Sequence, residues 1–423
     1  MQTTRIILKG LFIFIVLSLF SENASSITAW ARKYNVSCGT CHSMGYRLNR
    51  EGMDFMRRGH YYPKDEASKA IEEFVSFNTK IRFNDGNDSD TLDNKIGEVT
   101  FEHHAFALYG GGLLAERFSF FTEVYLHERE GNLSTVDGFK DGGRTKLAEA
   151  YLQYTRGDEN YFTVRAGQIA SQLWYFQGAG GRVAETRNFL VNNATIKTNA
   201  GIQNNWLPRQ RDYGVEVGGQ FGDLHGAFGV TNGNGNSPTN TVENKGQSAK
   251  DFFTSWDYTL KDRAMFGLFY HNGTLEDPAN PAVPEQNQDD FWRLGFTINS
   301  NPTDRLWLLG SYIKGKDEDS ISAAGFAPDV ESSGFALEAD YLLNLDHGIV
   351  PFVRFDHFTH DGKSTPLLEI NTDNDVFVAG CSFNLFEEQR GRLVIEWQYQ
   401  KQQEADVDKT KDQNLRIELA FML

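Results

Sequence analysis

Apolar and polar side chains alternate with a period of two along most of the chain, from residue 73 to the end. In the first such run Val75, Phe77 and Ile81 fall on one face, and Lys80 and Arg82 fall on the other. Each run is about ten residues long, the length of a tilted strand that crosses a lipid bilayer. The pattern therefore predicts β-strands with one apolar face. Comparable runs cover residues 118–127, 252–260, 292–298, 335–343, 393–399 and 415–423.

The connections between these runs alternate between short and long. Long polar loops, of which 171–211 is the longest, separate the short turns. We count about sixteen strands, and an even number of antiparallel strands is typical of outer-membrane barrels. A soluble β-sandwich leaves the alternation of loop lengths unexplained. We expect short turns near residues 110–112, 157–160, 222–223, 261–263, 301–304, 344–348 and 387–391.

The sequence thus predicts an all-β fold, an outer-membrane antiparallel β-barrel. In such a barrel both chain ends and the short turns lie on the periplasmic side, and the long loops face outside. The side chains that alternate with the apolar face point into the lumen. Among them we expect Lys80, Arg82, Glu123 and Arg165 to pair with one another or with a bound anionic group.

Residues 1–29 have the features of an export signal. Arg5 and Lys9 precede an unbroken apolar run at 11–20, and small residues follow from Ala24 onward. The run is shorter than the roughly 20 residues that a membrane-spanning helix needs. We interpret the segment as a signal peptide, and the alternative is an uncleaved membrane anchor.

A short motif with defined chemistry follows directly. Cys38-Gly39-Thr40-Cys41-His42 is the C-x-x-C-H sequence to which haem c is attached. Each thiol can form a thioether with one haem vinyl group, and the histidine can bind the iron. A thioredoxin-like site needs a surrounding βαβ pattern, and a zinc site needs two more ligands nearby, whereas Cys381 is far away. We therefore predict one covalent haem c held by Cys38, Cys41 and His42, with His42 as the ligand of the metal.

The haem segment, residues 30–72, is too small to enclose the cofactor. A segment this short cannot bury a haem alone, and a barrel of this size leaves a water-filled lumen unless it is plugged. We therefore expect the segment to enter the periplasmic end of the barrel formed by residues 73–423. The second iron ligand is Met44, Met53, Met56 or His60, or the iron has no second ligand from the protein.

The acidic composition narrows the class of partner. Asp and Glu number 57 against 41 Lys and Arg, a formal net charge of -16, which indicates no nucleic-acid partner. Several predicted outer loops are acidic, such as 85–90 and 316–319. These loops are ordinary solvated segments in one interpretation. In the other they produce a field that gathers cations at the mouth of the barrel.

Two stretches beside the motif resemble the fused cytochrome-porins, whose best-known members are the outer-membrane iron oxidases of iron-oxidising bacteria. Residues 30–37 lead into C-x-x-C-H as an aromatic-Ala-Arg run does in that family. Residues 51–61 are similar to its Gly-Arg-x-Phe-Lys-x-x-Gly-Tyr stretch. Here Met53 and Met56 replace the Arg and the Lys, and His60 precedes the aromatic residue. More loosely, the stretch 211–219 is similar to one in phosphate-selective-type porins.

The resemblance implies an electron-transfer protein of the outer membrane that could act as an Fe(II) oxidase. An extracellular donor, Fe(II), would reduce the haem, and a periplasmic electron-carrier cytochrome would accept the electron. Such a protein needs no acid–base or nucleophilic residue of its own, because the chemistry belongs to the cofactor. One alternative is a diffusion porin with a structural or sensory haem plug. Another is a soluble periplasmic cytochrome with a β-domain.

Overall fold

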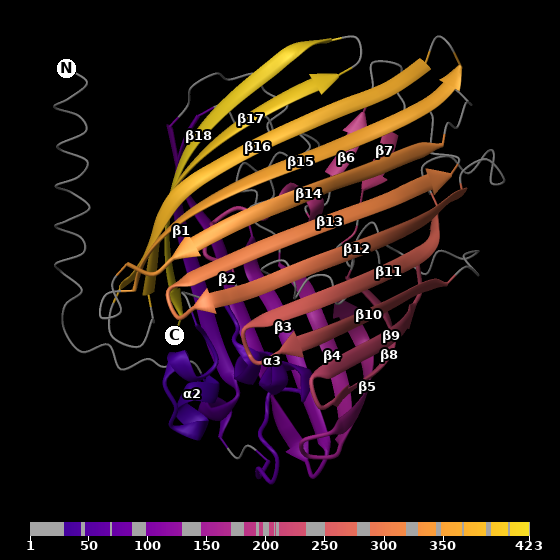
Figure 1. Cartoon of the computed structure of the whole chain (residues 1–423). Helices are drawn as coiled ribbons and strands as arrows, with labels where there is room; N and C mark the ends of the chain where they lie inside the picture. Colours follow the sequence, from indigo (N-terminus) through magenta and orange to yellow (C-terminus); the bar gives the residue numbers. More distant parts are fainter. Residues whose placement is uncertain are drawn as a thin grey trace, which may run out of the picture.

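The computed structural model of the chain (Figure 1) describes residues 29–43, 47–67, 70–86, 99–128, 145–170, 182–191, 194–197, 203–206, 208, 211–233, 250–276, 288–318, 329–343, 348–365, 368–385, 391–404 and 407–422. Apart from Ala29, the predicted signal peptide lies outside these residues. No helix in the described part is long and apolar enough to span a membrane.

The described strands form a closed antiparallel barrel of sixteen, which confirms the predicted architecture (Figure 1). Sequential strands are neighbours, and the barrel closes where β1 pairs with β18. The strands are β1 (Val75–Gly86), β2 (Val99–Ala115), β3 (Phe118–Glu128), β4 (Lys146–Arg156), β5 (Tyr161–Ala170), β8 (Arg211–Phe221), β9 (Leu224–Thr231), β10 (Asp251–Leu260), β11 (Ala264–Glu276), β12 (Gln288–Thr303), β13 (Leu306–Glu318), β14 (Val330–Tyr341), β15 (Ile349–Thr365), β16 (Leu368–Leu385), β17 (Gly391–Glu404) and β18 (Val407–Met422).

Strand β15 shows how the wall divides its side chains. Val353 and Phe355 point outward and are 48% and 37% exposed. Phe352, Arg354 and Phe358 point inward and are buried. Such a barrel is apolar outside and charged inside, the inverse of a soluble protein, and only lipid can cover its outer face. The protein is therefore an outer-membrane β-barrel, as predicted.

The prediction of a turn at residues 110–112 is wrong. Strand β2 runs on to Ala115, and the chain turns at Glu116 with a positive φ of 37°. Gly111 lies instead within strand β2, where its carbonyl oxygen accepts a hydrogen bond from Trp30 Nε1 at 2.8 Å. A Cβ atom at Gly111 would lie 3.1 Å from the Trp30 ring. These glycines leave room for the N-terminal segment, so a turn signal in the sequence was in fact a docking surface.

The longest loop does not simply face outside, as had been expected. Its described part, here called the lumen loop, comprises residues 182–191, 194–197 and 203–206 and includes η3 (Phe189–Val191), β6 (Ala194–Lys197) and β7 (Gln203–Trp206). Val183, Leu190 and Trp206 are fully buried among inward-facing side chains of the wall. An apolar segment between acidic loops gains more from burial inside the barrel than from exposure to water.

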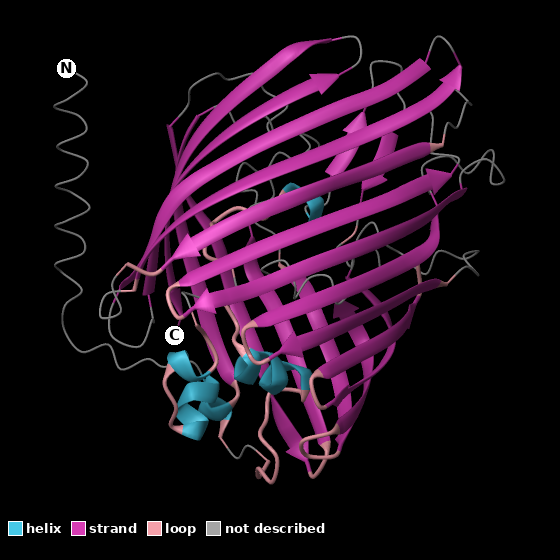
Figure 2. Cartoon of the chain, viewed as in Figure 1, coloured by secondary structure: helices cyan, strands magenta, loops and turns pink. Residues whose placement is uncertain are grey.

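The N-terminal residues fill the end of the barrel at which the short turns lie. Figure 2 shows the helices α2 (Ala29–Tyr34) and α3 (Arg50–Arg57) gathered there, close to the C-terminal end of β18. We call residues 29–43 and 47–62 the plug. They include η1 (Cys38–Thr40), and η2 (Ile71–Glu73) joins the plug to β1. The N-terminal residues were expected to enter the barrel at the end where the short turns lie, and the structure has them there.

Candidate haem site

The C-x-x-C-H motif forms a single helical turn. The backbone N–H of Cys41 donates to Cys38 O at 3.2 Å, and that of His42 donates to the same oxygen at 2.9 Å. Residues three and four positions apart on a helical turn lie on one side of it. The turn therefore directs Cys38, Cys41 and His42 toward the same region, and none of the three cysteines of the chain forms a disulfide.

Helix α3 holds this turn in place. Asn49 caps the helix by accepting from Gly52 N at 2.9 Å, and its own backbone N–H donates to Cys41 O at 2.9 Å. The Asn49 side chain also donates to Thr40 O at 2.9 Å. A Cβ atom at Gly52 would lie only 2.3 Å from the Cys41 carbonyl oxygen. The helix can approach the turn this closely only because residue 52 is glycine.

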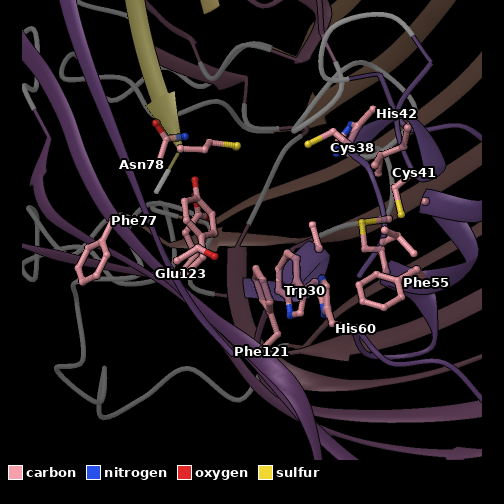
Figure 3. Close-up of a pocket in the computed structure, with 18 of the residues that line it drawn as sticks. Trp30, Cys38, Cys41, His42, Phe55, His60, Phe77, Asn78, Phe121 and Glu123 are labelled. Atoms are coloured by element: carbon pink, nitrogen blue, oxygen red, sulfur yellow. The ribbon is translucent and has the colours of Figure 1, made fainter. Parts of the chain in front are cut away.

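A cavity of about 300 Å³ separates the motif from the barrel wall. Figure 3 shows Cys38, Cys41 and His42 on one side of it and Asn78 and Glu123 on the other. Aromatic rings of the plug and the wall make up much of its lining. Burial raises the pKa of the Cys41 thiol, so the thiol is neutral at pH 7.

Basic residues outnumber acidic ones around the cavity. Lys80, Arg182, Arg187 and Arg392 line it, and the lining carboxylates are Glu123 and Glu149. Both carboxylates face Arg211, whose guanidinium nitrogens lie 3.1 Å from Glu123 Oε2 and 3.9 Å from Glu149 Oε1. An apolar cavity with a basic wall suits a flat apolar group that carries carboxylates.

His60 joins the plug to the wall. Its ring stacks between Trp30 of the plug and Phe121 of β3, with ring centroids 4.6 Å apart on each side. Burial lowers its pKa to about 3, so the imidazole is neutral at pH 7, and its Nδ1 is buried without a hydrogen-bond partner. The residue before it is Gly59, which has a φ of +93°. A Cβ atom added at Gly59 would lie 2.1 Å from Ser119 Oγ, so only glycine fits there.

The four candidates for the second iron ligand separate in the structure. Met56 and His60 line the cavity. Met53 lines a different, smaller cavity between α3 and the turns of the wall. Met44 lies outside the described residues. Sequence reasoning missed Asn78 and Met422, which also line the cavity.

Buried ion pairs anchor the plug. Arg47 Nε and Nη2 each lie 2.5 Å from a carboxylate of β14, those of Asp340 and Glu338. Arg57 Nη2 lies 2.7 Å from Asp257 Oδ2 of β10. Because each of these charges is desolvated, the loss of one partner leaves the other buried and unpaired. The plug is therefore fixed to two separate strands of the wall, β14 and β10, by charge as well as by packing.

The lumen charges that the sequence singled out do pair with other charged groups of the barrel. Arg82 Nη2 lies 2.9 Å from Glu418, and Arg165 Nη1 lies 3.4 Å from Glu216. Lys80 Nζ is 3.8 Å from Glu418. Among these residues, Lys80 and Glu123 also line the cavity. These ion pairs, with that of Glu123 to Arg211, join the four residues to other charged groups of the barrel and not to one another, so the expected pairing among the four is not what these contacts show.

The residues around the cavity fit a covalent haem. Two thiols that form no disulfide and an imidazole come from one turn, aromatic rings line the space beside them, and basic side chains that could pair with propionates line the same cavity. No cluster of three or more His, Cys, Asp or Glu able to hold a bare metal ion occurs among the residues that the structure describes.

Fold and plug together define the class: a porin-type outer-membrane barrel with an N-terminal plug.

No family model and no curated protein matches the sequence. The outer-membrane channel DcaP of Acinetobacter baumannii is similar in fold, with 11% identity, 82% of this chain and 96% of that chain covered, and a TM-score of 0.58. The anion-selective porin of Comamonas acidovorans has 11% identity over 82% and 98% of the two chains, with a TM-score of 0.55. OmpF of Salmonella typhi, solved in complex with daunomycin, has 9% identity over 82% and 97%, with a TM-score of 0.54. Identities this low show the fold alone.

Proposed function

We propose that the protein is a fused cytochrome-porin that carries electrons across the outer membrane through one covalent haem c. The observation that carries this proposal is the position of the C-x-x-C-H turn. It faces a basic and aromatic cavity at the barrel mouth, and the barrel wall there supplies the side of the site that the small plug lacks. The proposed division of the chain is 1–29, signal peptide; 30–72, cytochrome segment; and 73–423, barrel.

Each part of the site has a distinct task in this proposal. Cys38 and Cys41 bind the cofactor, and His42 orients it by holding the iron. The bound haem supplies reversible one-electron chemistry. Arg182 and Arg187 neutralise its carboxylates, and the plug excludes water from the short-turn side.

The position of the plug supports inward electron flow in this proposal. A plug in the periplasmic mouth leaves the haem accessible to a periplasmic electron-carrier cytochrome, and the donor then comes from outside, with Fe(II) as the proposed donor. The lumen loop reaches down to the cavity, where Arg182 and Arg187 line it. The acidic stretch 316–319 contributes less to an outer field than its sequence indicates, because Asp317 is buried against Arg293.

A diffusion porin with a structural or sensory haem plug is the second candidate, and the likeness in fold to solved channels favours it. The packing of the lumen favours the first. Diffusion porins keep a water-filled channel, whereas here Leu190 and Trp206 of the lumen loop pack against inward-facing rings of the wall such as Phe253 and Phe358.

Two measurements on the purified protein separate the candidates. The first is the reduction of the haem by Fe(II) under anaerobic conditions, followed by absorbance. The second is ion conductance in a planar lipid bilayer. The electron-transfer function predicts rapid reduction and little conductance. Porin-like conductance together with a haem that Fe(II) leaves oxidised would establish the second candidate instead.

A further inference from the structure

We propose that Met422, at the end of β18, supplies the second axial ligand of the haem iron, on the side opposite His42. The inference rests on the proposed function, since it requires the covalent haem at Cys38 and Cys41. A thioether sulfur is a known partner of histidine in c-type haems, where it raises the reduction potential. Met422 lies 380 positions from His42 in the sequence, so only the closed barrel brings the two together.

The register of the barrel seam fixes the direction of the Met422 side chain. Met422 is paired with Asn78 of β1, and residues directly opposite each other in an antiparallel pair project to the same face. Asn78 is buried and lines the cavity, as Met422 does. Two positions further along each strand Lys80 pairs with Ala420, which is also buried in the lumen. Met422 therefore points inward, beside Asn78.

Met422 and His42 line the same cavity. Figure 3 shows Asn78, the partner of Met422 in the seam, on the side of the cavity that faces Cys38 and His42. A haem bound to the thiols of the turn could then be held by His42 from the plug and by Met422 from this wall. The end of the seam is also tied to the plug, because Ala29 N donates to Ser76 Oγ at 2.7 Å.

The other candidates approach from less suitable directions. Met56 belongs to helix α3, whose cap Asn49 binds the turn of the motif directly, so it reaches the cavity from the element that already supports Cys41 and His42. Met53 lines the separate cavity. Both faces of the His60 ring are covered by Trp30 and Phe121, at the end of the cavity away from His42. His60 thus serves to hold the plug against the wall.

Spectroscopy of the holoprotein tests this ligand. A bond between ferric iron and methionine sulfur gives a weak far-red charge-transfer band. We expect the band in the wild type and in Met56→Leu, which removes the other methionine among the described residues that line the cavity. Met422→Ala should lose the band completely and have a lower midpoint potential. Met422→His should lack the band and give a bis-histidine spectrum. A heat-dependent shift in electrophoretic mobility checks that each variant forms a barrel.

Several results would overturn the ligand assignment. One is a wild type without the band, and another is a band that persists in Met422→Ala. Loss of the band in Met56→Leu alone would assign Met56. A bis-histidine spectrum in the wild type that His60→Phe abolishes would assign His60. The same preparations keep the two proposals apart. Covalent haem that Fe(II) does not reduce refutes the electron-transfer function and leaves the ligand test intact, whereas absence of covalent haem refutes both.

Discussion

The plug and the lumen loop occupy the same barrel but differ in how apolar and charged groups hold them there. The lumen loop combines apolar packing with polar contacts. Val183, Leu190 and Trp206 are fully buried in clusters that include wall residues, Glu185 pairs with Arg82, and Thr186 bonds to Glu396 and Arg354. The plug is held by arginines that reach buried carboxylates of the wall, and by the stacked rings of Trp30 and His60. The loop fills its space, whereas the plug leaves a cavity beside the motif.

This difference shows how one barrel can have a packed lumen and still keep space for a cofactor. Close packing leaves little room for a cofactor, because protein interiors are as dense as organic crystals. Directed ion pairs fix a segment at a few points and let the remainder stand away from the wall. A site for a large prosthetic group is therefore expected under the plug rather than under the lumen loop.

The largest expected effect follows from Cys38→Ala, which removes one thioether from the plug. We expect covalent haem to fall to a small fraction of the wild-type amount, measured by haem staining after denaturing electrophoresis. Cys381→Ala is the matched control, because Cys381 belongs to β16 and does not line the cavity. Equal haem content in the two variants would contradict the assignment of the motif.

Arg47→Met tests the charge-based anchoring of the plug. The substitution leaves Asp340 and Glu338 buried without their partner, and the loss of one member of a buried pair costs about 3–5 kcal/mol. We expect faster amide hydrogen exchange in the plug while the barrel strands stay protected. Arg50→Met should change little, because the ion pairs of Arg50 are exposed and such pairs contribute about 1 kcal/mol or less. Similar exchange rates in the two variants would argue against this anchoring.

Trp206→Ala tests the apolar packing of the lumen loop. Removal of a fully buried tryptophan costs about 3–5 kcal/mol, because a cavity remains. We expect bilayer conductance to rise while haem content stays at the wild-type level. Loss of haem without a rise in conductance would show that the two regions are not independent.

The smallest effect concerns the contact between α3 and the motif. In Gly52→Ala the new methyl group meets the Cys41 carbonyl oxygen at 2.3 Å, and such overpacking costs about 1–3 kcal/mol. We expect a lower melting temperature and a partial loss of haem. Gly39→Ala is the control, because its new Cβ atom has only Ser37 Oγ nearby, at 3.7 Å. A Gly52→Ala protein as stable as the control would show that the helix can move away from the turn.

The barrel could be predicted from the sequence because each strand carries its own signal. The alternation at Val75, Phe77 and Ile81 is local, and it records which face meets lipid. The C-x-x-C-H motif is equally local. The opposite wall of the cavity could not be predicted in this way, since Asn78 and Met422 meet only when the first and last strands pair. Glycines such as Gly111 were misread because the same residue suits a turn and a close contact.

The most direct test of the account is the reduction of the haem in intact cells that express the protein. Fe(II) added outside the cells should reduce the haem before the first absorbance reading. A bulky anionic reductant should reduce it far more slowly, because the lumen is packed and admits only a small cation or an electron transferred from it. If Fe(II) leaves the haem oxidised while periplasmic reductants reduce it, inward electron transfer from Fe(II) is refuted. A porin-type barrel with a structural haem is then the better description.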